Sequence, residues 1–225
     1  MRISVVIPTL NEALELPQTL ARLQGLGAVS EVIVADGGSR DETVELARAG
    51  GARVVLSPRG RGRQLREGAA VATGDAILLL HADTWMPPGG DVALIEVLAK
   101  PGAVAGAFLK RFREGHWLMA GSRLKCRIRM STLNFAYGDQ ALFVRRDILE
   151  RIGGVPAVPL MEEHELCRLL GQQGRLGLAS ATVLTSARRF RDRGVLRTYA
   201  RMIAIEIRWR LGASPERLAA AYPGS

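Results

Sequence analysis

The segment ISVVIPTLNE, residues 3–12, decides the fold, because a β-branched run at its start stops at a proline followed by polar residues. A short apolar run of this kind predicts a buried strand of a parallel sheet. Similar runs follow at residues 31–35 (EVIVA), 52–56 (ARVVL) and 76–80 (AILLL). The intervening segments are predicted helices, and the apolar residues spaced along the first are Leu14, Leu16, Leu20 and Leu23. This βαβαβαβ order predicts a parallel sheet with right-handed crossovers.

The rest of the chain has a less regular pattern. It predicts helices at residues 91–99, 117–131, 147–152, 162–172 and 194–211, and strands at 103–112, 141–145 and 178–184. No internal repeat, low-complexity tract or linker interrupts it. We therefore expect a single α/β domain over residues 1–225, with a mostly parallel central sheet and helices on both faces.

The composition is that of a globular protein with an uneven charge. Of 225 residues, 48% are apolar and 24% charged, which argues against disorder. Residues 1–100 carry 10 basic and 12 acidic side chains, a net charge of −2, whereas residues 101–225 carry 21 and 10, a net charge of +11. This asymmetry predicts an anionic partner for the second half, with a solvated basic surface as the alternative.

The sequence also indicates a compartment. The longest run without a charged residue has 12 residues, 176–187, and a membrane-spanning helix needs roughly 20 apolar residues. Pro8, Asn11 and Glu12 come too early for a secretory signal. Cys126 and Cys167 lie far apart without metal-ligand spacing, which is typical of reduced thiols. We expect a cytoplasmic protein.

Polar residues follow each of the first four predicted strands. They are PTLNE at residues 8–12, DGGS at 36–39, RGRGR at 59–63 and HADT at 81–84. Glycines and capping residues belong at such junctions in any case. Three arginines and the two aspartates, Asp36 and Asp83, exceed what turns need, and ligands bind at the carboxyl ends of parallel strands. The four segments therefore predict one shared ligand site.

The residue types in these segments indicate the ligand. Carboxylates at Asp36 and Asp83 suit a ribose, a base edge or a hard divalent cation. Arginine side chains and glycine amides suit phosphate. Together they predict a nucleoside diphosphate with Mg²⁺ or Mn²⁺. No G-x-G-x-x-G follows the first strand and the chain has no Walker loop, which disfavours dinucleotide and P-loop sites.

The motifs PTLNE, DGGSRDET, GRGRQLREGAAVATGDAILLLHADT and MEEHEL resemble those of glycosyltransferase family 2 over nearly the whole chain. The sequence is most similar to a short bacterial branch with a His-Ala-Asp motif and a Ser-Ala-Arg-Arg-Phe stretch, often associated with arsenosugar or radical-SAM gene neighbourhoods. The resemblance implies the GT-A (Rossmann-like) fold and an inverting, metal-dependent sugar transfer from a nucleotide-sugar donor, with UDP as the nucleotide. It implies a nucleotide-binding half at residues 1–100 and an acceptor-binding half at 101–225.

The resemblance also assigns roles to residues of the donor site. Asp83 matches the last position of the metal-binding D-x-D motif and would hold the divalent cation, whereas His81 replaces its first acid. Asp36 would contact the base, and Arg63 the base or diphosphate. The residues implied at the nucleotide and its diphosphate are Pro8, Thr9, Glu12, Asp36, Gly38, Arg63, His81, Ala82, Arg188 and Arg189.

The acceptor side depends on Glu162-Glu163, where the family usually has a Glu-Asp pair at a helix start. We assign Glu163 as the catalytic base and Glu162 as its structural or acceptor-binding partner. Asp139 is the alternative base. Two acids at a helix N-terminus also satisfy the helix dipole, which is a purely structural interpretation.

Two other functions stay open at this point. A sugar-phosphate nucleotidyltransferase has a similar sheet but carries a Gly-rich basic loop after its first strand, where this chain has PTLNE. A nucleic-acid-binding protein would use the basic second half. Aromatic residues are only 5% of the chain, which leaves few stacking platforms, so no nucleic-acid partner is expected.

The predicted helix at residues 194–211 is amphipathic and basic. Its apolar stripe consists of Leu196, Tyr199, Ile203 and Ile207, widened by Val195 and Met202. A separate face carries Arg197, Arg201 and Arg208. We expect the stripe to pack on the sheet or on a second subunit in a homodimer. The alternative is a peripheral contact with the inner face of an anionic membrane.

Overall fold

The computed structural model describes residues 1–114, 119 and 121–221. Within these residues one eight-stranded sheet has the order β3-β2-β1-β4-β7-β6-β8-β5. The strands are β1 Ile3–Thr9, β2 Val29–Asp36, β3 Arg53–Leu56, β4 Ala76–Leu79, β5 Thr84–Trp85, β6 Ala103–Phe112, β7 Leu142–Arg145 and β8 Arg175–Thr185. The helices are α1 Leu16–Leu23, α2 Thr43–Ala49, α3 Arg61–Ala70, α4 Gly90–Leu98, α5 Ser122–Leu133, α6 Arg146–Arg151, α7 Glu162–Gln173, α8 Arg188–Arg193, α9 Val195–Arg210 and α10 Pro215–Ala220, with a 3₁₀ turn, η2, at Gly138–Gln140.

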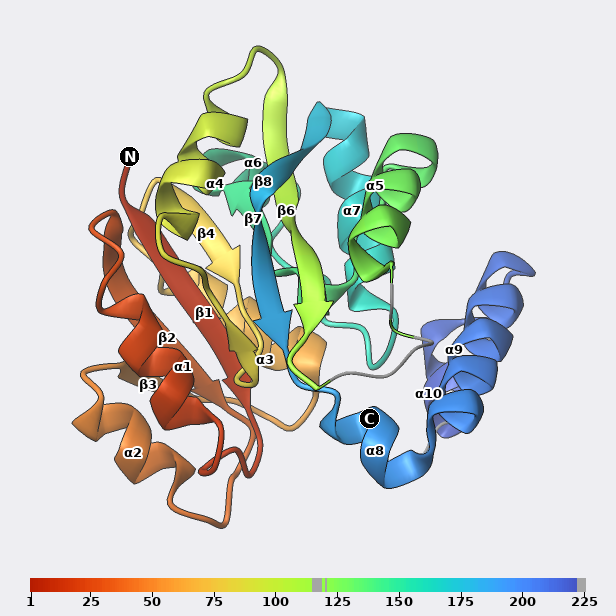
Figure 1. Ribbon diagram of the computed structural model, residues 1–225, viewed down its shortest axis with the longest axis horizontal. Helices are drawn as coiled ribbons and strands as arrows, with labels where there is room; N and C mark the ends of the chain where they lie inside the picture. Colours follow the sequence, from red (N-terminus) through yellow and green to blue (C-terminus); the bar gives the residue numbers. More distant parts are fainter. Residues whose placement is uncertain (115–118, 120, 222–225) are drawn as a thin grey trace.

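The first half of the sheet is parallel, as the sequence predicts. β2 pairs with β1 and β3, and β1 pairs with β4, all in parallel. The second half adds β7, which is antiparallel to both β4 and β6, and β8, which is parallel to β6. β6 therefore runs in the direction of β4, so the carboxyl ends of these strands share one edge (Figure 1).

Helices cover both faces of the sheet because successive strand residues point to opposite sides. On β1, Val5 and Ile7 join the core cluster that contains residues of α1 and α4, whereas Val6 joins the cluster beneath α3, α6 and α7. The α/β class and the two-faced arrangement are confirmed. Leu14, predicted on the apolar face of the first helix, is exposed because α1 begins only at Leu16.

Two glycines of α3 allow the close packing that shapes the site. A Cβ on Gly68 would lie 2.5 Å from Cγ1 of Val6, so only glycine lets this helix approach β1 so closely. A Cβ on Gly62 would lie 2.7 Å from the carbonyl oxygens of Pro156 and Val158. The start of α3 therefore contacts the segment that leads into α7.

The C-terminal helices lie at the carboxyl-end side of the sheet, at the lower right of Figure 1. Phe190 of α8 packs edge-on against Phe112 at the end of β6, and Tyr199 of α9 packs on Phe190. The apolar stripe of α9, which we predicted to be covered, is covered only in part. Tyr199 is half-buried, whereas Leu196, Ile203 and Ile207 are exposed. The prediction that the whole stripe packs on the sheet is wrong, because α9 turns Thr198, Tyr199 and Met202 inward instead.

Candidate functional site

A cavity of about 240 Å³ lies at the carboxyl edge of the sheet. His81 and Asp83 reach it from the segment after β4, Asp139 from η2, and Glu163 from the start of α7. Residues of α8 and α9 complete the wall, among them Phe190, Met202 and Glu206. The structure therefore brings together the predicted metal ligand, the predicted base and the alternative base, which lie up to 80 positions apart in the sequence.

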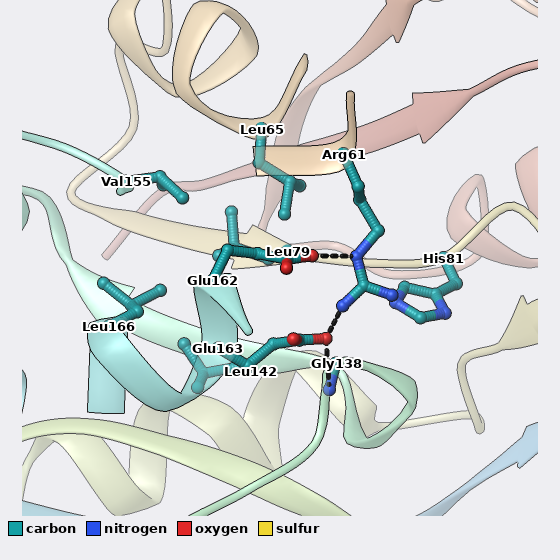
Figure 2. Close-up of a pocket in the computed structure, with 10 residues that line it drawn as sticks. All are labelled: Arg61, Leu65, Leu79, His81, Gly138, Leu142, Val155, Glu162, Glu163 and Leu166. Atoms are coloured by element: carbon teal, nitrogen blue, oxygen red, sulfur yellow. Dashed lines mark hydrogen bonds and ion pairs between the residues drawn. The ribbon is translucent and has the colours of Figure 1, made fainter. Parts of the chain in front are cut away.

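Arg61 joins the two glutamates at the start of α7. Its Nε donates to Oε1 of Glu162 at 2.5 Å, and its terminal nitrogen forms an ion pair with Glu163 (Figure 2). The backbone N–H of Gly138 donates to Oε1 of Glu163 at 3.1 Å. Both glutamates lie at a helix N-terminus, where the macrodipole also favours negative charge. One guanidinium and one amide therefore hold both acids in fixed positions.

Gly138 lies so close to the site that an added side chain would displace its neighbours. A Cβ at this position would lie 2.7 Å from a terminal nitrogen of Arg61 and 2.7 Å from Nε2 of His81. The backbone of η2 therefore lies directly against the floor of the cavity. Beside it, Lys110 from β6 forms an ion pair with Asp139. Burial alone would raise the pKa of Asp139, but the charge of Lys110 lowers this pKa below its ordinary value. Asp139 is therefore ionised at neutral pH.

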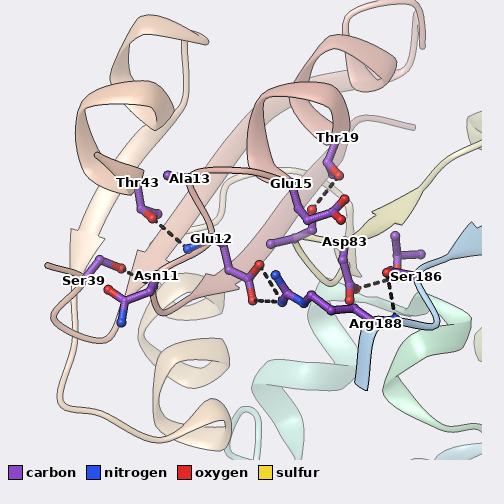
Figure 3. Close-up of polar contacts among 12 residues, drawn as sticks. Asn11, Glu12, Ala13, Glu15, Thr19, Ser39, Thr43, Asp83, Ser186 and Arg188 are labelled. Atoms are coloured by element: carbon purple, nitrogen blue, oxygen red, sulfur yellow. Dashed lines mark hydrogen bonds and ion pairs between the residues drawn. The ribbon is translucent and has the colours of Figure 1, made fainter. Parts of the chain in front are cut away.

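Asp83 lies near a second ion pair, between Glu12 and Arg188 (Figure 3). One terminal nitrogen of Arg188 donates to both carboxylate oxygens of Glu12, at 2.9 and 3.0 Å. Burial raises the pKa of Glu12; Arg188 opposes the shift, and the charges of Asp83 and Glu15 add to it. The backbone N–H of Ser186 donates to the carbonyl oxygen of Asp83 at 3.2 Å, which ties the start of the α8 segment to the strand end.

Asp36 is buried and holds the turn after β2. It accepts bonds from the Thr9 hydroxyl at 2.9 Å, the Gly38 N–H at 2.9 Å and the Ser39 N–H at 2.8 Å. Gln64 of α3 donates to the carbonyl oxygens of Thr9 and Ala35 at 2.6 and 2.9 Å. Thr9, Asp36 and Gly38 therefore form one rigid strand-end unit.

The other predicted donor-site residues lie in different settings. Pro8 is part of β1, and the carbonyl oxygen of Ala82 accepts a 2.6 Å bond from the Thr19 hydroxyl. Arg63 is exposed and does not line the cavity. The side chain of Arg189 lies outside the part of the chain that the structure describes. Arg61, two positions before Arg63, lines the cavity instead. The sequence alone had not singled out this arginine.

His164 connects α7 with α9 and lines the cavity. Its Nε2 lies 2.6 Å from Oε2 of Glu206, and its ring lies against Phe135 and Trp209. Burial lowers the pKa of His164, and the nearby Glu206 only partly opposes this shift. A neutral imidazole therefore fixes α9 at the cavity.

Asp83, the predicted metal ligand, lines the cavity. Among residues 1–114, 119 and 121–221, no three His, Cys, Asp or Glu side chains cluster as a metal site. A cation held by the Asp83 carboxylate would therefore take its other ligands from water and a bound phosphate. No helix in the described part of the chain is long and apolar enough to cross a membrane.

Comparisons with known proteins agree with this architecture. The model of the glycosyl transferase family 2 matches residues 4–153. An undecaprenyl-phosphate 4-deoxy-4-formamido-L-arabinose transferase from Pseudomonas paraeruginosa is 32% identical over 163 residues, 66% of this chain and 48% of that protein. The Klebsiella pneumoniae protein of the same name is 31% identical over 156 residues, 64% of this chain and 48% of that protein. The chain thus spans about half the length of these relatives.

Solved structures share the fold. Glucosyl-3-phosphoglycerate synthase from Mycobacterium tuberculosis in complex with Mg²⁺ and UDP superposes with a TM-score of 0.61 and 25% identity, over 82% of this chain and 70% of that chain. A mannosyltransferase from Pyrobaculum calidifontis in complex with GDP-mannose and Mn²⁺ gives a TM-score of 0.66 at 23% identity, over 82% of this chain and 56% of that chain. Both likenesses confirm the predicted GT-A architecture.

Proposed function

The chain belongs to glycosyltransferase family 2, and we propose that it transfers a sugar from a nucleoside-diphosphate donor to an acceptor bound in the 240 Å³ cavity. The observation that carries this proposal is that Asp83 and Glu163, from distant parts of the chain, line the same cavity. A metal-dependent transferase needs a cation at the departing diphosphate and a binding place for the acceptor on the other side of the sugar.

The donor belongs to the half formed by residues 1–100. The rigid unit of Thr9, Asp36 and Gly38 would form the floor beneath the nucleoside, with Glu12 beside it. Asp83 would hold Mn²⁺ or Mg²⁺, which neutralises the departing diphosphate. Arg188 is placed to bind a phosphate oxygen when it leaves Glu12. UDP is our choice of nucleotide, supported by the synthase structures that contain it.

The acceptor belongs to the half formed by residues 101–225. For a hydroxyl acceptor, Glu163 would remove the proton in a single displacement that inverts the anomeric centre. Glu162, which is more buried, would keep Arg61 in place. Asp139 remains the alternative base, although Lys110 neutralises it.

A phosphate acceptor is the second candidate, and the pairing of Glu163 with Arg61 favours it. A phosphate oxygen is already ionised and needs no base, so a neutralised Glu163 would be no obstacle. Arg61 at the cavity and Lys110 beside it are the cations that would bind such a phosphate, in exchange for their carboxylate partners. The relatives named undecaprenyl-phosphate transferases support such an acceptor.

Thermal unfolding with added nucleotide tests the proposal. UDP, GDP and CMP are each added with and without Mn²⁺, and we expect one nucleoside diphosphate to stabilise the chain only with the metal. Asp83→Ala should remove this stabilisation and abolish transfer while leaving the protein folded. Asp147→Ala, an exposed carboxylate on α6, serves as the control. Stabilisation by nucleoside triphosphates alone would favour a nucleotidyltransferase instead.

We also propose that the protein acts in the cytoplasm at the inner face of the membrane. Support comes from the basic second half and from the exposed face of α9. The contact would be made through residues 194–211, and a homodimer through the same face is the competing outcome.

A further inference from the structure

The outer face of α9 is apolar and exposed. Large apolar side chains that are more than half exposed recur along it at steps of seven, four and four: Leu196, Ile203, Ile207 and, at the C-terminal cap, Leu211. At about 100° per residue they fall within an arc of about 80°, so they form one continuous stripe. The helix has 16 residues, which makes the stripe about 24 Å long.

Arginines adjoin this stripe along one side. Arg197, Arg201 and Arg208 fall on the arc directly beside the apolar residues when the helix is viewed along its axis. They belong to the half of the chain that carries a net charge of +11, from 21 basic and 10 acidic residues. α9 is thus a basic amphipathic helix whose apolar side faces outward.

The neighbouring helix α5 also exposes apolar and basic side chains. Of the eleven exposed large apolar residues in the described part of the chain, three lie on α5 and four on α9 or its cap. Leu124 and Ile128 of α5 alternate with Arg123 and Arg127. The ammonium group of Lys125 lies 5.8 Å from the ring of Tyr199, so the two helices are in contact. Exposed apolar side chains therefore concentrate at one end of the molecule.

The inner face of α9 forms a wall of the cavity. Met202, Ile205 and Glu206 line it, and Glu206 binds His164 at 2.6 Å. One helix thus separates the exposed apolar stripe from the space where the acceptor would bind. Whatever binds the outer face of α9 lies one helix diameter from the acceptor, about 10 Å.

We propose that α9 lies on an anionic lipid bilayer, with the stripe at the level where headgroups meet acyl chains and Arg197, Arg201 and Arg208 on lipid phosphates. This geometry would bring the cavity to the membrane surface, so that an acceptor with a lipid chain enters beside α9. The acceptor part of this inference rests on the proposed sugar transfer, whereas the docking itself does not.

A second copy of the chain fits this face less well than a bilayer. In a symmetric dimer the same patch meets itself, so the three arginines of each copy would approach those of the other. The stripe is also only one helix wide and about 24 Å long. Its area is therefore small beside the roughly 800 Å² that each partner buries in a standard interface. An anionic surface satisfies both the charge and the apolar stripe.

Co-sedimentation of the 225-residue chain with vesicles tests the proposal. One set contains phosphatidylcholine alone and the other adds phosphatidylglycerol. We expect the chain to pellet with the anionic vesicles at low salt, and to stay in solution with neutral vesicles or at high salt, where the lipid charge is screened. Failure to pellet with anionic vesicles at low salt would overturn the proposal.

Variants assign the binding to α9. Each basic residue near an anionic surface strengthens binding about fivefold, so Arg197→Gln/Arg201→Gln/Arg208→Gln should weaken it about 100-fold. Arg40→Gln/Arg48→Gln/Arg53→Gln removes the same charge from exposed positions in the first half and should have a much smaller effect. Equal effects of the two triple variants would contradict a specific face.

The stripe has its own control. Ile203→Ser/Ile207→Ser should abolish pelleting, whereas Leu56→Ser/Val92→Ser, at two positions that are also more than half exposed, should not. Unchanged pelleting of the stripe variant would overturn the proposal, as would a lipid-free dimer that this variant abolishes in analytical ultracentrifugation. Stabilisation by UDP and Mn²⁺ should persist in all these variants, so a failure of docking is distinguished from a failure of the proposed function.

Discussion

Replacing Arg61 by methionine would leave two buried carboxylates without the guanidinium that they share. The side chains of Glu162 and Glu163 are only 5% and 15% exposed, whereas that of Arg61 is 31% exposed. Breaking a fully buried ion pair by removing one partner costs about 3–5 kcal/mol. Because water reaches Arg61 and the Gly138 amide still binds Glu163, we expect a smaller loss of about 2–3 kcal/mol. Methionine keeps the apolar stem, so lost packing contributes little.

Urea unfolding measures this loss as a fall in the midpoint at unchanged slope. Arg63→Met is the matched control, because Arg63 is exposed on the same helix and should change the unfolding free energy by less than about 0.5 kcal/mol. Arg61→Met/Glu162→Gln should recover part of the loss, because it removes the more buried of the two charges. The double-mutant cycle then gives the coupling between Arg61 and Glu162 directly.

Equal stability of Arg61→Met and Arg63→Met would refute this reasoning. It would mean that water solvates the glutamates in solution and that Arg61 does not hold them. A failure of the Glu162→Gln change to recover any stability would locate the cost elsewhere, in the packing of α3 against the segment before α7.

Three further predictions concern single side chains of α7. Glu163→Gln should lower turnover by about 10²–10⁴ while donor binding is kept; a loss only in Glu162→Gln would exchange their roles, and no loss in either would support a phosphate acceptor. Burial holds the pKa of His164 below its ordinary value of 6.5, so the unfolded chain takes up a proton first and stability should fall as the pH drops below about 6.5. His164→Gln should flatten that part of the profile of urea midpoints, and an unchanged slope would contradict the assignment. Burial raises the pKa of Cys167 from 9.0 to about 11, so in a Cys126→Ser background iodoacetamide at pH 8 should label the native thiol about 100-fold more slowly than the unfolded one; equal rates would show an accessible thiolate.

The parallel half of the fold was predictable because each strand is a local pattern. The composition of residues 3–7 alone predicts β1. The apolar run that predicts β4 likewise places Asp83 just after a strand end. The site pairs Asp83 with Glu163, which lies 80 residues later. Only the family resemblance, and not spacing, suggested that these two residues meet. The short elements β5, η2 and α8 have two, three and six residues, too few to show a period.

Arg61 shows what the sequence could not decide. In RGRGR three arginines alternate with glycines, so composition alone does not rank Arg59, Arg61 and Arg63. The structure does so because α3 begins at Arg61, after Gly60 at φ 135°, and the helical phase then turns Arg61 to the cavity and Arg63 to solvent. The close approach of Gly62 to the carbonyl oxygens of Pro156 and Val158 is a structural observation that fixes how α3 is rotated.

The same limit explains the error on α9. Apolar residues at helical spacing show that a helix has an apolar face, but they do not show what that face contacts. The inward side of α9 contains the polar residues Thr198 and Glu206. These become acceptable inside because the Thr198 hydroxyl donates to the carbonyl oxygen of Gly194 at 2.8 Å, and His164 binds Glu206. The second partner comes from α7, so only the tertiary structure reveals that polar residues can face inward and leave the apolar stripe outside.

Two arginines at the cavity bind carboxylates that a substrate would have to replace. Arg188, from the basic second half, pairs with Glu12 from the acidic first half, and Arg61 pairs with both Glu162 and Glu163. A diphosphate arriving with its cation would offer Arg188 a stronger partner, while the cation would take up negative charge near Asp83 and Glu12. Net charge in the cavity would then change little on binding, which avoids leaving any buried ion unpaired. We therefore expect Arg188 to bind the donor, in addition to the membrane role proposed for the arginines beside the apolar stripe of α9.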